Sequence, residues 1–193
     1  MIIREAELQD VPVLAEMINH YARERVLLPR PLPELYECVR EFVVAEEDGV
    51  IVGCGALKFY NAELAEIRSL CVAPGVSHHG VGRALVEDLI EEAGRRRLKT
   101  VFALTMAPQF FQKCGFRETI RERLPQKVWR DCLRCEKYFC CDEKAFVFDL
   151  VARDAADVEE SQKQRNPQPE TIPSVINDPP SAWAGRSLVM PAR

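Results

Sequence analysis

A loop with two glycines, Gly80 and Gly82, lies between a stretch typical of a β-strand and a stretch typical of a long helix. The first turn of a helix presents unpaired backbone N–H groups and the positive end of the helix dipole to an anion. Glycine lets the backbone approach such a ligand closely, because it carries no side chain. The loop is therefore predicted to hold a phosphate group. Its other residues are Ser77, His78, His79 and Val81, and Arg83 follows it.

The surroundings of the loop argue against one common phosphate site. A Gly-x-Gly pair also occurs in ordinary turns, and a dinucleotide-binding fold needs a third glycine and a β-α-β repeat. Position 85 is Leu, and the strands predicted before the loop form a hairpin. The loop therefore favours a different phosphate-containing ligand.

A charged pair, Glu66 and Arg68, stands on the predicted strand 65–72, directly before the loop. Side chains alternate between the two faces of a strand. Such alternation places Glu66, Arg68 and Leu70 on one face, and Ile67, Ser69 and Cys71 on the other. A charged pair on a strand usually lies on a solvent-exposed face. The position of this pair beside an anion-binding loop nevertheless makes both residues candidates for catalysis or binding.

Periodicity and turn residues predict the elements that position this loop. A helix begins after Asp10, because Leu14, Ile18 and Tyr21 share one face at helical spacing. Asp48-Gly49 predicts a hairpin turn. The predicted strands are 2–6, 42–46, 50–59, 65–72, 99–105, one beginning at Gly115-Phe116, and 144–150. The other predicted helices are 34–41, a long one from Gly80, and 108–113. This order predicts a mixed α/β fold with a central, mostly antiparallel, twisted sheet flanked by helices.

Composition bounds the classes of function. Of the 193 residues, 47% are hydrophobic and 29% are charged, which is typical of a globular domain. The net charge of −4 argues against nucleic-acid binding, and no apolar run approaches the roughly 20 residues that span a membrane. A cytoplasmic protein is therefore expected. The segment 151–193 holds six of the 13 prolines and lacks periodicity, so it is predicted to be a disordered tail after a domain of residues 1–150.

The eight cysteines fall into two groups. Four are scattered through apolar patterns and are expected to pack as small core residues: Cys38, Cys54, Cys71 and Cys114. The other four cluster in a segment at 124–142: Cys132, Cys135, Cys140 and Cys141. One Cys-x-x-Cys unit with an adjacent pair leaves three alternatives open, namely a zinc site, a redox pair or unligated thiols. A metal bound by these cysteines would stabilise the segment and would lie outside the catalytic cleft. No metal is expected at the glycine loop.

The order of elements, together with two motifs, resembles the GNAT acyltransferase superfamily over nearly all of residues 1–150. The first motif is Cys71-Val72-Ala73-Pro74 followed by Gly80-Val81-Gly82-Arg83-Ala84-Leu85. The second is Phe110-Phe111-Gln112-Lys113-Cys114-Gly115-Phe116. Four further segments, 41–46, 52–57, 64–70 and 102–105, resemble the acetyltransferase part of N-acetylglutamate synthases. The chain has no room for the amino-acid-kinase-like domain of the longer synthases, so it resembles their short, stand-alone form.

This resemblance implies an enzyme that transfers acetyl from acetyl-CoA to the α-amine of glutamate, or of glutamine, as the first step of arginine biosynthesis. Glu66 matches the strand position from which a carboxylate takes a proton from the amine, a contribution of about 10²–10⁴-fold. The segment Leu70-Cys71-Val72 is expected to donate a backbone N–H to the developing oxyanion. The loop 77–82, with Arg83, is expected to bind the CoA pyrophosphate. Arg4, Arg30 and Arg68 are candidates for the acceptor carboxylates, because arginine binds a carboxylate with two parallel hydrogen bonds.

The sequence departs from the family pattern at several positions. Phe111 stands where many members have a tyrosine that protonates the CoA thiolate, so Phe111 is expected only to pack beside the cofactor, and Thr105 or water is left as the donor. Ser77, His78 and His79 replace more usual loop residues. Two alternatives therefore stay open: an acetyltransferase of a protein amine or another small amine, and an acyl-CoA sensor without catalysis. The oligomeric state, including a homo-oligomer, is also left open.

Overall fold

The structure is a computed structural model that describes residues 1–76, 80–124, 127, 131–135 and 138–151. All of these residues belong to one compact unit, Met1–Ala156. The strands are β1 (Ile2–Glu5), β2 (Phe42–Glu47), β3 (Val50–Phe59), β4 (Leu64–Val72), β5 (Thr100–Thr105), β6 (Arg117–Thr119) and β7 (Lys144–Asp149). The helices are α1 (Val11–Arg23), α2 (Leu32–Glu37), α3 (Val81–Arg95) and α4 (Pro108–Lys113), with short 3₁₀ turns between elements.

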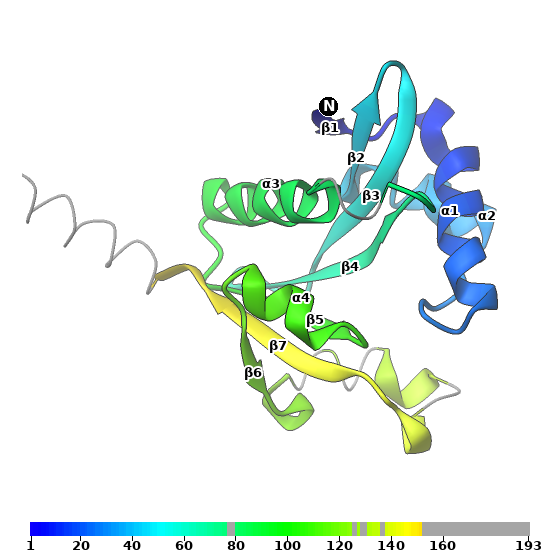
Figure 1. The fold of residues 1–193 in the computed structure, drawn as a ribbon. Helices are drawn as coiled ribbons and strands as arrows, with labels where there is room; N and C mark the ends of the chain where they lie inside the picture. Colours follow the sequence, from blue (N-terminus) through cyan, green and yellow to red (C-terminus); the bar gives the residue numbers. More distant parts are fainter. Residues whose placement is uncertain (77–79, 125–126, 128–130, 136–137, 152–193) are drawn as a thin grey trace, which may run out of the picture. The chain divides into compact units, whose positions relative to one another are not determined.

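The strands form one sheet in the order β1-β2-β3-β4-β5-β7-β6 (Figure 1). Neighbouring strands are antiparallel except for β4 and β5, which are parallel. The expected mixed α/β fold with a mostly antiparallel sheet is confirmed.

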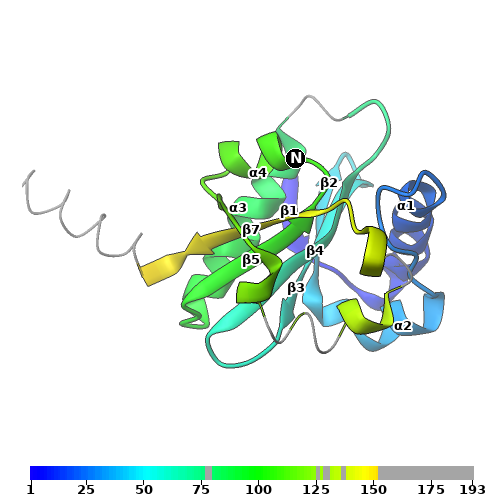
Figure 2. The ribbon, with the colours of Figure 1, turned by 90° about the horizontal axis from the view of Figure 1, so that it is seen from below.

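Helices cover both faces of the sheet, with α1 and α2 on one face and α3 on the other (Figures 1 and 2). On the α3 face, Leu85, Leu89 and Ile90 pack against strand residues such as Ile67, and α4 adds Phe111 to the same core. On the opposite face, the apolar stripe of α1 packs on β3 and β4. The residues of this second core include Leu14, Ile18, Leu35, Phe42 and Cys54.

Local sequence explains most helix boundaries, with two differences from expectation. Asp10 precedes α1 as predicted, but its carboxylate does not cap that helix and instead accepts the N–H of Glu7 at 2.8 Å. The second helix, Leu32–Glu37, begins two residues and ends four residues earlier than predicted. It ends there because Cys38 leaves the helical conformation and a 3₁₀ turn, Val39–Glu41, leads into β2.

Strict alternation along β4 proves wrong at Ser69. This residue has a positive φ of 52°, and the register between β3 and β4 shifts nearby. A bulge of this kind inserts one extra residue into the strand and reverses the faces beyond it. As a result Leu70 lies with Ile67 on the α3 face, and not with Glu66 and Arg68, whereas Cys71 packs on the α1 face.

The segment at 124–142 contains two short 3₁₀ turns, Cys132–Arg134 and Tyr138–Cys140. Its four cysteines are free thiols, of which Cys132 is buried and Cys140 is exposed. Within the described residues, no group of three or more His, Cys, Asp or Glu side chains is placed to hold a metal ion. The predicted tail lies outside the described residues, apart from Val151, so its disorder stays a prediction. None of the described helices combines the length and apolar character needed to cross a membrane.

The Arg4 guanidinium joins two carboxylates at the edge of the sheet. Its Nη1 donates to Asp10 Oδ2 at 2.7 Å, and its Nε donates to Glu46 Oε2 at 2.7 Å. Arg4 holds the pKa of the Asp10 carboxyl below its usual range, although burial alone would raise that pKa. The pair therefore stabilises the folded state above about pH 4–5 and loses this contribution as the pH falls through the lowered pKa of Asp10.

Replacing Arg4 with glutamine is expected to lower the free energy of unfolding by about 1–2 kcal/mol at neutral pH, because buried Asp10 loses its charged partner. The difference between Arg4→Gln and the wild type should shrink in acid, where Asp10 becomes protonated. Thermal melts at neutral pH and below pH 4 measure both effects. An equal difference at the two pH values would contradict the ion pair as the cause.

Candidate active site

Strands β4 and β5 form a fork. They pair only at their first residues, where Leu64–Glu66 lies beside Thr100–Phe102. Farther along, β5 continues its pairing with β7 and β4 continues its pairing with β3. The ladder between β4 and β5 therefore ends at Glu66, and the backbone of β4 beyond that point borders an opening in the sheet.

A cavity of about 650 Å³, here called the fork cavity, lies in this opening. One wall is formed by β4 residues 67–72, and a second by residues 104–107 with Phe110 and Phe111. Thr105 is on the second wall, and its Oγ1 accepts the Ala107 N–H at 2.9 Å. An elongated, largely apolar ligand fits between such walls, with backbone polar groups of β4 along one side.

Helix α3 begins at the mouth of the fork cavity. Gly80 precedes it with a φ of 79°, a left-handed conformation that favours glycine. Gly82 and Arg83 also line the cavity, and a Cβ at Gly82 would contact the Phe110 ring at 3.4 Å. The first turn of a 15-residue helix is thus directed to one end of the cavity, as an anion site requires. Ser77, His78 and His79 lie outside the described residues.

Glu66 lies at the base of the fork and is 3% exposed. Lys127 Nζ is 2.9 Å from its Oε1 and 3.1 Å from its Oε2, and the Tyr60 hydroxyl is 2.9 Å from Oε2. Burial alone would lower the pKa of Lys127, but the negative charges of Glu66 and Asp131 raise it. Lys127 is therefore a cation that compensates for the burial of the Glu66 carboxylate.

Asp131 extends this network toward solvent. Lys58 Nζ donates to its Oδ2 at 3.0 Å, Lys127 Nζ donates to the same oxygen at 3.1 Å, and the Tyr60 hydroxyl lies 2.5 Å away. Burial alone would raise the pKa of Asp131, but these donors hold it well below its usual range. Asp131 is therefore ionised at neutral pH.

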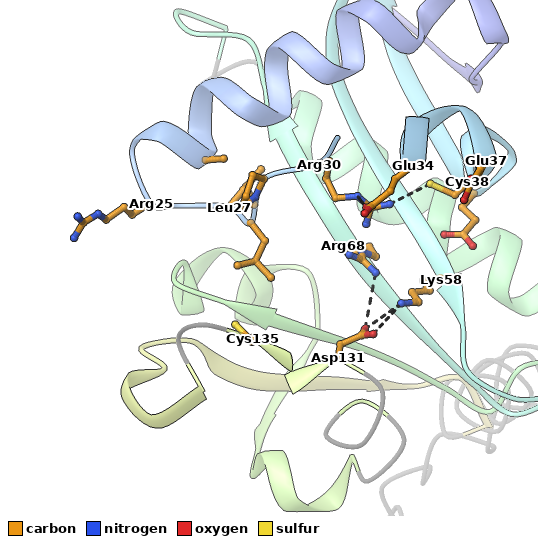
Figure 3. A pocket seen from close by; sticks show the side chains of 14 residues that line it. Arg25, Leu27, Arg30, Glu34, Glu37, Cys38, Lys58, Arg68, Asp131 and Cys135 are labelled. Atoms are coloured by element: carbon orange, nitrogen blue, oxygen red, sulfur yellow. Dashed lines mark hydrogen bonds and ion pairs between the residues drawn. The ribbon is translucent and has the colours of Figure 1, made fainter. Parts of the chain in front are cut away.

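A second cavity, of about 790 Å³ and here called the charged cavity, lies between the α1–α2 connection and strands β3 and β4. Figure 3 shows Arg30, Arg68 and Lys58 pointing toward a shared space, with Asp131 opposite them. Cations and carboxylates both line it. The carboxylates are Glu34, Glu37, Glu41 and Asp131, and the cations are Arg25, Arg30, Lys58 and Arg68.

Arg30 is fixed by its backbone and leaves part of its guanidinium without a hydrogen bond. Asn19 accepts the Arg30 N–H and donates to its carbonyl, both at 2.9 Å. Arg30 is 9% exposed, and its Nη2 donates to Cys38 Sγ at 3.1 Å. Its buried Nε has no hydrogen-bond partner in the described residues, and it forms only a long ion pair with the exposed Glu34 carboxylate, at 3.7 Å. A buried guanidinium of this kind is suited to an anionic ligand.

A small cavity of about 60 Å³, here called the junction cavity, shares lining residues with both of the larger ones. It shares Arg30 and Arg68 with the charged cavity, and Ser69 and Leu104 with the fork cavity. Glu66 and Lys127 line it. Ligands bound in the fork cavity and in the charged cavity would therefore approach each other near the Glu66 carboxylate.

The structure brings together most of the residues singled out from the sequence. Glu66, Arg30 and Arg68 surround the junction cavity. The fork cavity is lined by Leu70, Cys71, Val72, Gly80, Gly82, Arg83 and Phe111. Val81 is buried in the core beneath α3. Arg4 does not line any of these three cavities, because its guanidinium is bound to Asp10 and Glu46 on β1 and β2.

Three residues of the site were missed in the sequence: Tyr60, Lys127 and Asp131. The last two come from the cysteine-containing segment, which was expected to lie outside the cleft, and Cys135 also lines the charged cavity. The spacing of Lys127 and Asp131, which form an (i, i+4) ion pair, was the available signal. Only the tertiary structure reveals that Lys127 and Asp131 reach the site.

Comparisons with known proteins agree with this geometry. Residues 39–118 match the acetyltransferase (GNAT) domain model. An uncharacterized N-acetyltransferase of Chlorobaculum tepidum is 39% identical over 148 residues, which cover 77% of this chain and 96% of the relative. An amino-acid acetyltransferase of Mycobacterium tuberculosis is 41% identical over 120 residues, covering 61% of this chain and 68% of the relative.

Solved structures resemble the chain in the same way. A Mycobacterium tuberculosis protein in complex with CoA and NLQ superposes with a TM-score of 0.67 at 32% identity, covering 78% of this chain and 99% of that one. The N-acetylglutamate synthase of Neisseria gonorrhoeae, complexed with coenzyme A and N-acetyl-glutamate, gives a TM-score of 0.68 at 28% identity. The match covers 77% of this chain but only 35% of the synthase. With this sheet, this fork and these relatives, the chain belongs to the GNAT family of acetyl-CoA-dependent N-acetyltransferases.

Proposed function

We propose that the protein transfers the acetyl group of acetyl-CoA to the α-amine of L-glutamate, or of L-glutamine, as the first step of arginine biosynthesis. One observation carries the proposal: a buried carboxylate, Glu66, lies at the junction of an apolar fork cavity and a charged cavity whose cations include the buried Arg30. Relatives and structural neighbours that are amino-acid acetyltransferases or N-acetylglutamate synthases support the class of acceptor.

The fork cavity is proposed to hold acetyl-CoA, which supplies the thioester. The first turn of α3, with Gly80, Gly82 and Arg83, binds the pyrophosphate together with the loop 77–79. The pantetheine arm lies along β4 beside Phe111. A backbone N–H in Leu70–Val72 donates to the thioester oxygen as negative charge develops on it.

The charged cavity is proposed to hold the acceptor. An amino acid with an acidic side chain carries two carboxylates and one ammonium group, so a cavity with both signs of charge suits it. Arg30 and Arg68 bind the carboxylates, because both reach the junction cavity and the Nε of Arg30 has no hydrogen-bond partner among the described residues. Arg4 is not part of this proposal, since its guanidinium is bound elsewhere.

Glu66 is proposed as the general base. It takes one proton from the α-ammonium, and the freed amine forms an N–C bond to the thioester carbon. As the C–S bond breaks, the CoA sulfur leaves as a thiolate and gains the second proton of the former ammonium group. Thr105 or water delivers that second proton. The overall reaction releases one proton, which Glu66 must lose to solvent after each turnover.

The proposed catalytic domain comprises residues 1–150. A cytoplasmic location agrees with a biosynthetic role. The proposed partners are the small-molecule substrates, without nucleic acid or membrane, and a homo-oligomer is compatible with the role.

Release of CoA thiol from acetyl-CoA, measured with a panel of amino acids and a lysine peptide, tests the acceptor. Glutamate or glutamine should give the highest kcat/KM. Turnover confined to the lysine peptide would replace this proposal with protein acetylation. Binding of acetyl-CoA without turnover of any acceptor would overturn it in favour of a sensor.

A further inference from the structure

Tyr60 lies between two carboxylates that belong to different cavities. Its hydroxyl is 2.9 Å from Glu66 Oε2 and 2.5 Å from Asp131 Oδ2. Glu66 lines the junction cavity, whereas Asp131 lines the charged cavity. The hydroxyl thus connects the proposed base to a carboxylate beside the open space where the acceptor enters.

The Tyr60 hydroxyl can donate its single proton to only one of the two carboxylates. A hydroxyl carries one proton and donates to one acceptor at a time. The 2.5 Å separation is typical of a hydroxyl that donates to an ionised carboxylate, so the Tyr60 proton belongs to the contact with Asp131. A lone pair of the Tyr60 oxygen then faces Glu66 Oε2. That contact becomes a hydrogen bond when Glu66 carries a proton and donates it.

Glu66 needs a route by which to lose its proton. The base gains one proton in each turnover, but it is 3% exposed and is enclosed by Lys127 and Tyr60. The Asp131 side chain is 28% exposed. A path from Glu66 to Asp131 therefore leads from a buried group to one that meets water.

Resting on the proposed function, we propose that Tyr60 and Asp131 form a proton exit path for Glu66. Protonated Glu66 Oε2 donates its proton to the Tyr60 oxygen as the Tyr60 hydroxyl gives its own proton to Asp131 Oδ2. Asp131 then releases this proton to water in the charged cavity, and the Tyr60 hydroxyl turns back. One proton enters the path and one leaves it, so all three groups return to their starting states.

Lys127 also touches both carboxylates, but it is less suited to this role. Glu66 and Asp131 keep it protonated, against the effect of its burial, and an ammonium group cannot accept a proton. Its function is to balance the charges of the two carboxylates. Tyr60 and Asp131 act through Glu66 and not on the substrate, so their role is to reset the base.

Rapid-mixing measurements of CoA release by Tyr60→Phe test the path. This variant keeps the ring that packs against Phe102, at 5.5 Å between centroids, and removes only the hydroxyl. The first turnover should stay near the wild-type rate, giving a burst of about one CoA per site. The steady-state rate should then be lower by at least about tenfold, because protonated Glu66 resets slowly.

A small external base should restore the steady-state rate of the variant. N-methylmorpholine is suitable, because a tertiary amine cannot be acetylated to a stable amide. Increasing concentrations of N-methylmorpholine should raise the steady-state rate of Tyr60→Phe and leave the steady-state rate of the wild type unchanged. Asp131→Asn should show the same burst and rescue, and Tyr36→Phe, an exposed tyrosine on α2, should behave as the wild type.

The outcomes separate the path from the proposed function. No turnover by the wild type overturns the function itself. Turnover by the wild type, with a first turnover of Tyr60→Phe as slow as its later ones and no rescue by the base, overturns the path and leaves Tyr60 a merely structural residue. A burst in Tyr60→Phe without one in Asp131→Asn overturns the exit through Asp131.

Discussion

Replacing Glu66 with glutamine is expected to lower kcat by about 10²-fold or more, with little change in the affinity for acetyl-CoA. The amide keeps the size of the side chain but cannot take a proton from the ammonium group, and general-base assistance is typically worth about 10²–10⁴-fold. The fork cavity, in contrast, is built from other residues of β4, α3 and α4. Steady-state kinetics together with titration of acetyl-CoA separate the two effects.

Two controls accompany Glu66→Gln. Lys127 keeps Asp131 as a charged partner at 3.1 Å in this variant, so the local fold should persist and a thermal melt can verify it. Glu91→Gln removes an exposed carboxylate of α3 and should leave kcat unchanged. A kcat for Glu66→Gln within about tenfold of the wild type would remove Glu66 from the role of base.

Replacing Arg30 with glutamine is expected to lower kcat/KM for the acceptor by about 10- to 100-fold, chiefly through KM. A hydrogen bond to a charged group contributes about 1.5–3 kcal/mol, and each 1.4 kcal/mol corresponds to about tenfold in binding. Arg30 is almost fully buried at the charged cavity, and its Nε has no hydrogen-bond partner in the part of the chain that the structure describes, so loss of an anionic ligand is the expected consequence. The KM for acetyl-CoA should not change.

The choice of acceptor sharpens this test. Glutamine lacks the side-chain carboxylate of glutamate, so an equal loss with both acceptors indicates that Arg30 binds the α-carboxylate, and a loss with glutamate alone indicates the side chain. Arg23→Gln, an exposed arginine of α1 outside the charged cavity, is the matched control. An unchanged KM for both acceptors in Arg30→Gln would exclude Arg30 from the acceptor site.

Much of the fold could be predicted from the sequence, because local signals determine its elements. The apolar stripe of α1, the Asp48-Gly49 turn and the glycine before α3 each reflect a short-range rule that holds wherever the segment lies. The strand bounds of the hairpin and the helix Pro108–Lys113 were predicted to within a residue. The alternation was predicted along all of β4 but is correct only up to Ser69, because a bulge depends on pairing with a neighbouring strand and leaves no clear local signal.

For the site, the sequence by itself determined which short segments are candidates for chemistry: the loop before α3, the charged pair on β4 and Arg30. It did not determine which side chains meet. Arg4 was a candidate for the acceptor carboxylates but is bound by Asp10 and Glu46, since β1, β2 and the turn before α1 bring those carboxylates to it.

Only the tertiary structure decided that Tyr60, Lys127 and Asp131 surround Glu66. Glu66 is six residues from Tyr60 and 61 from Lys127 in the chain. Contacts over such separations depend on how the sheet and the segment at 124–142 fold together. These contacts matter because Glu66 is buried, and a carboxylate removed from water requires partners that compensate its charge.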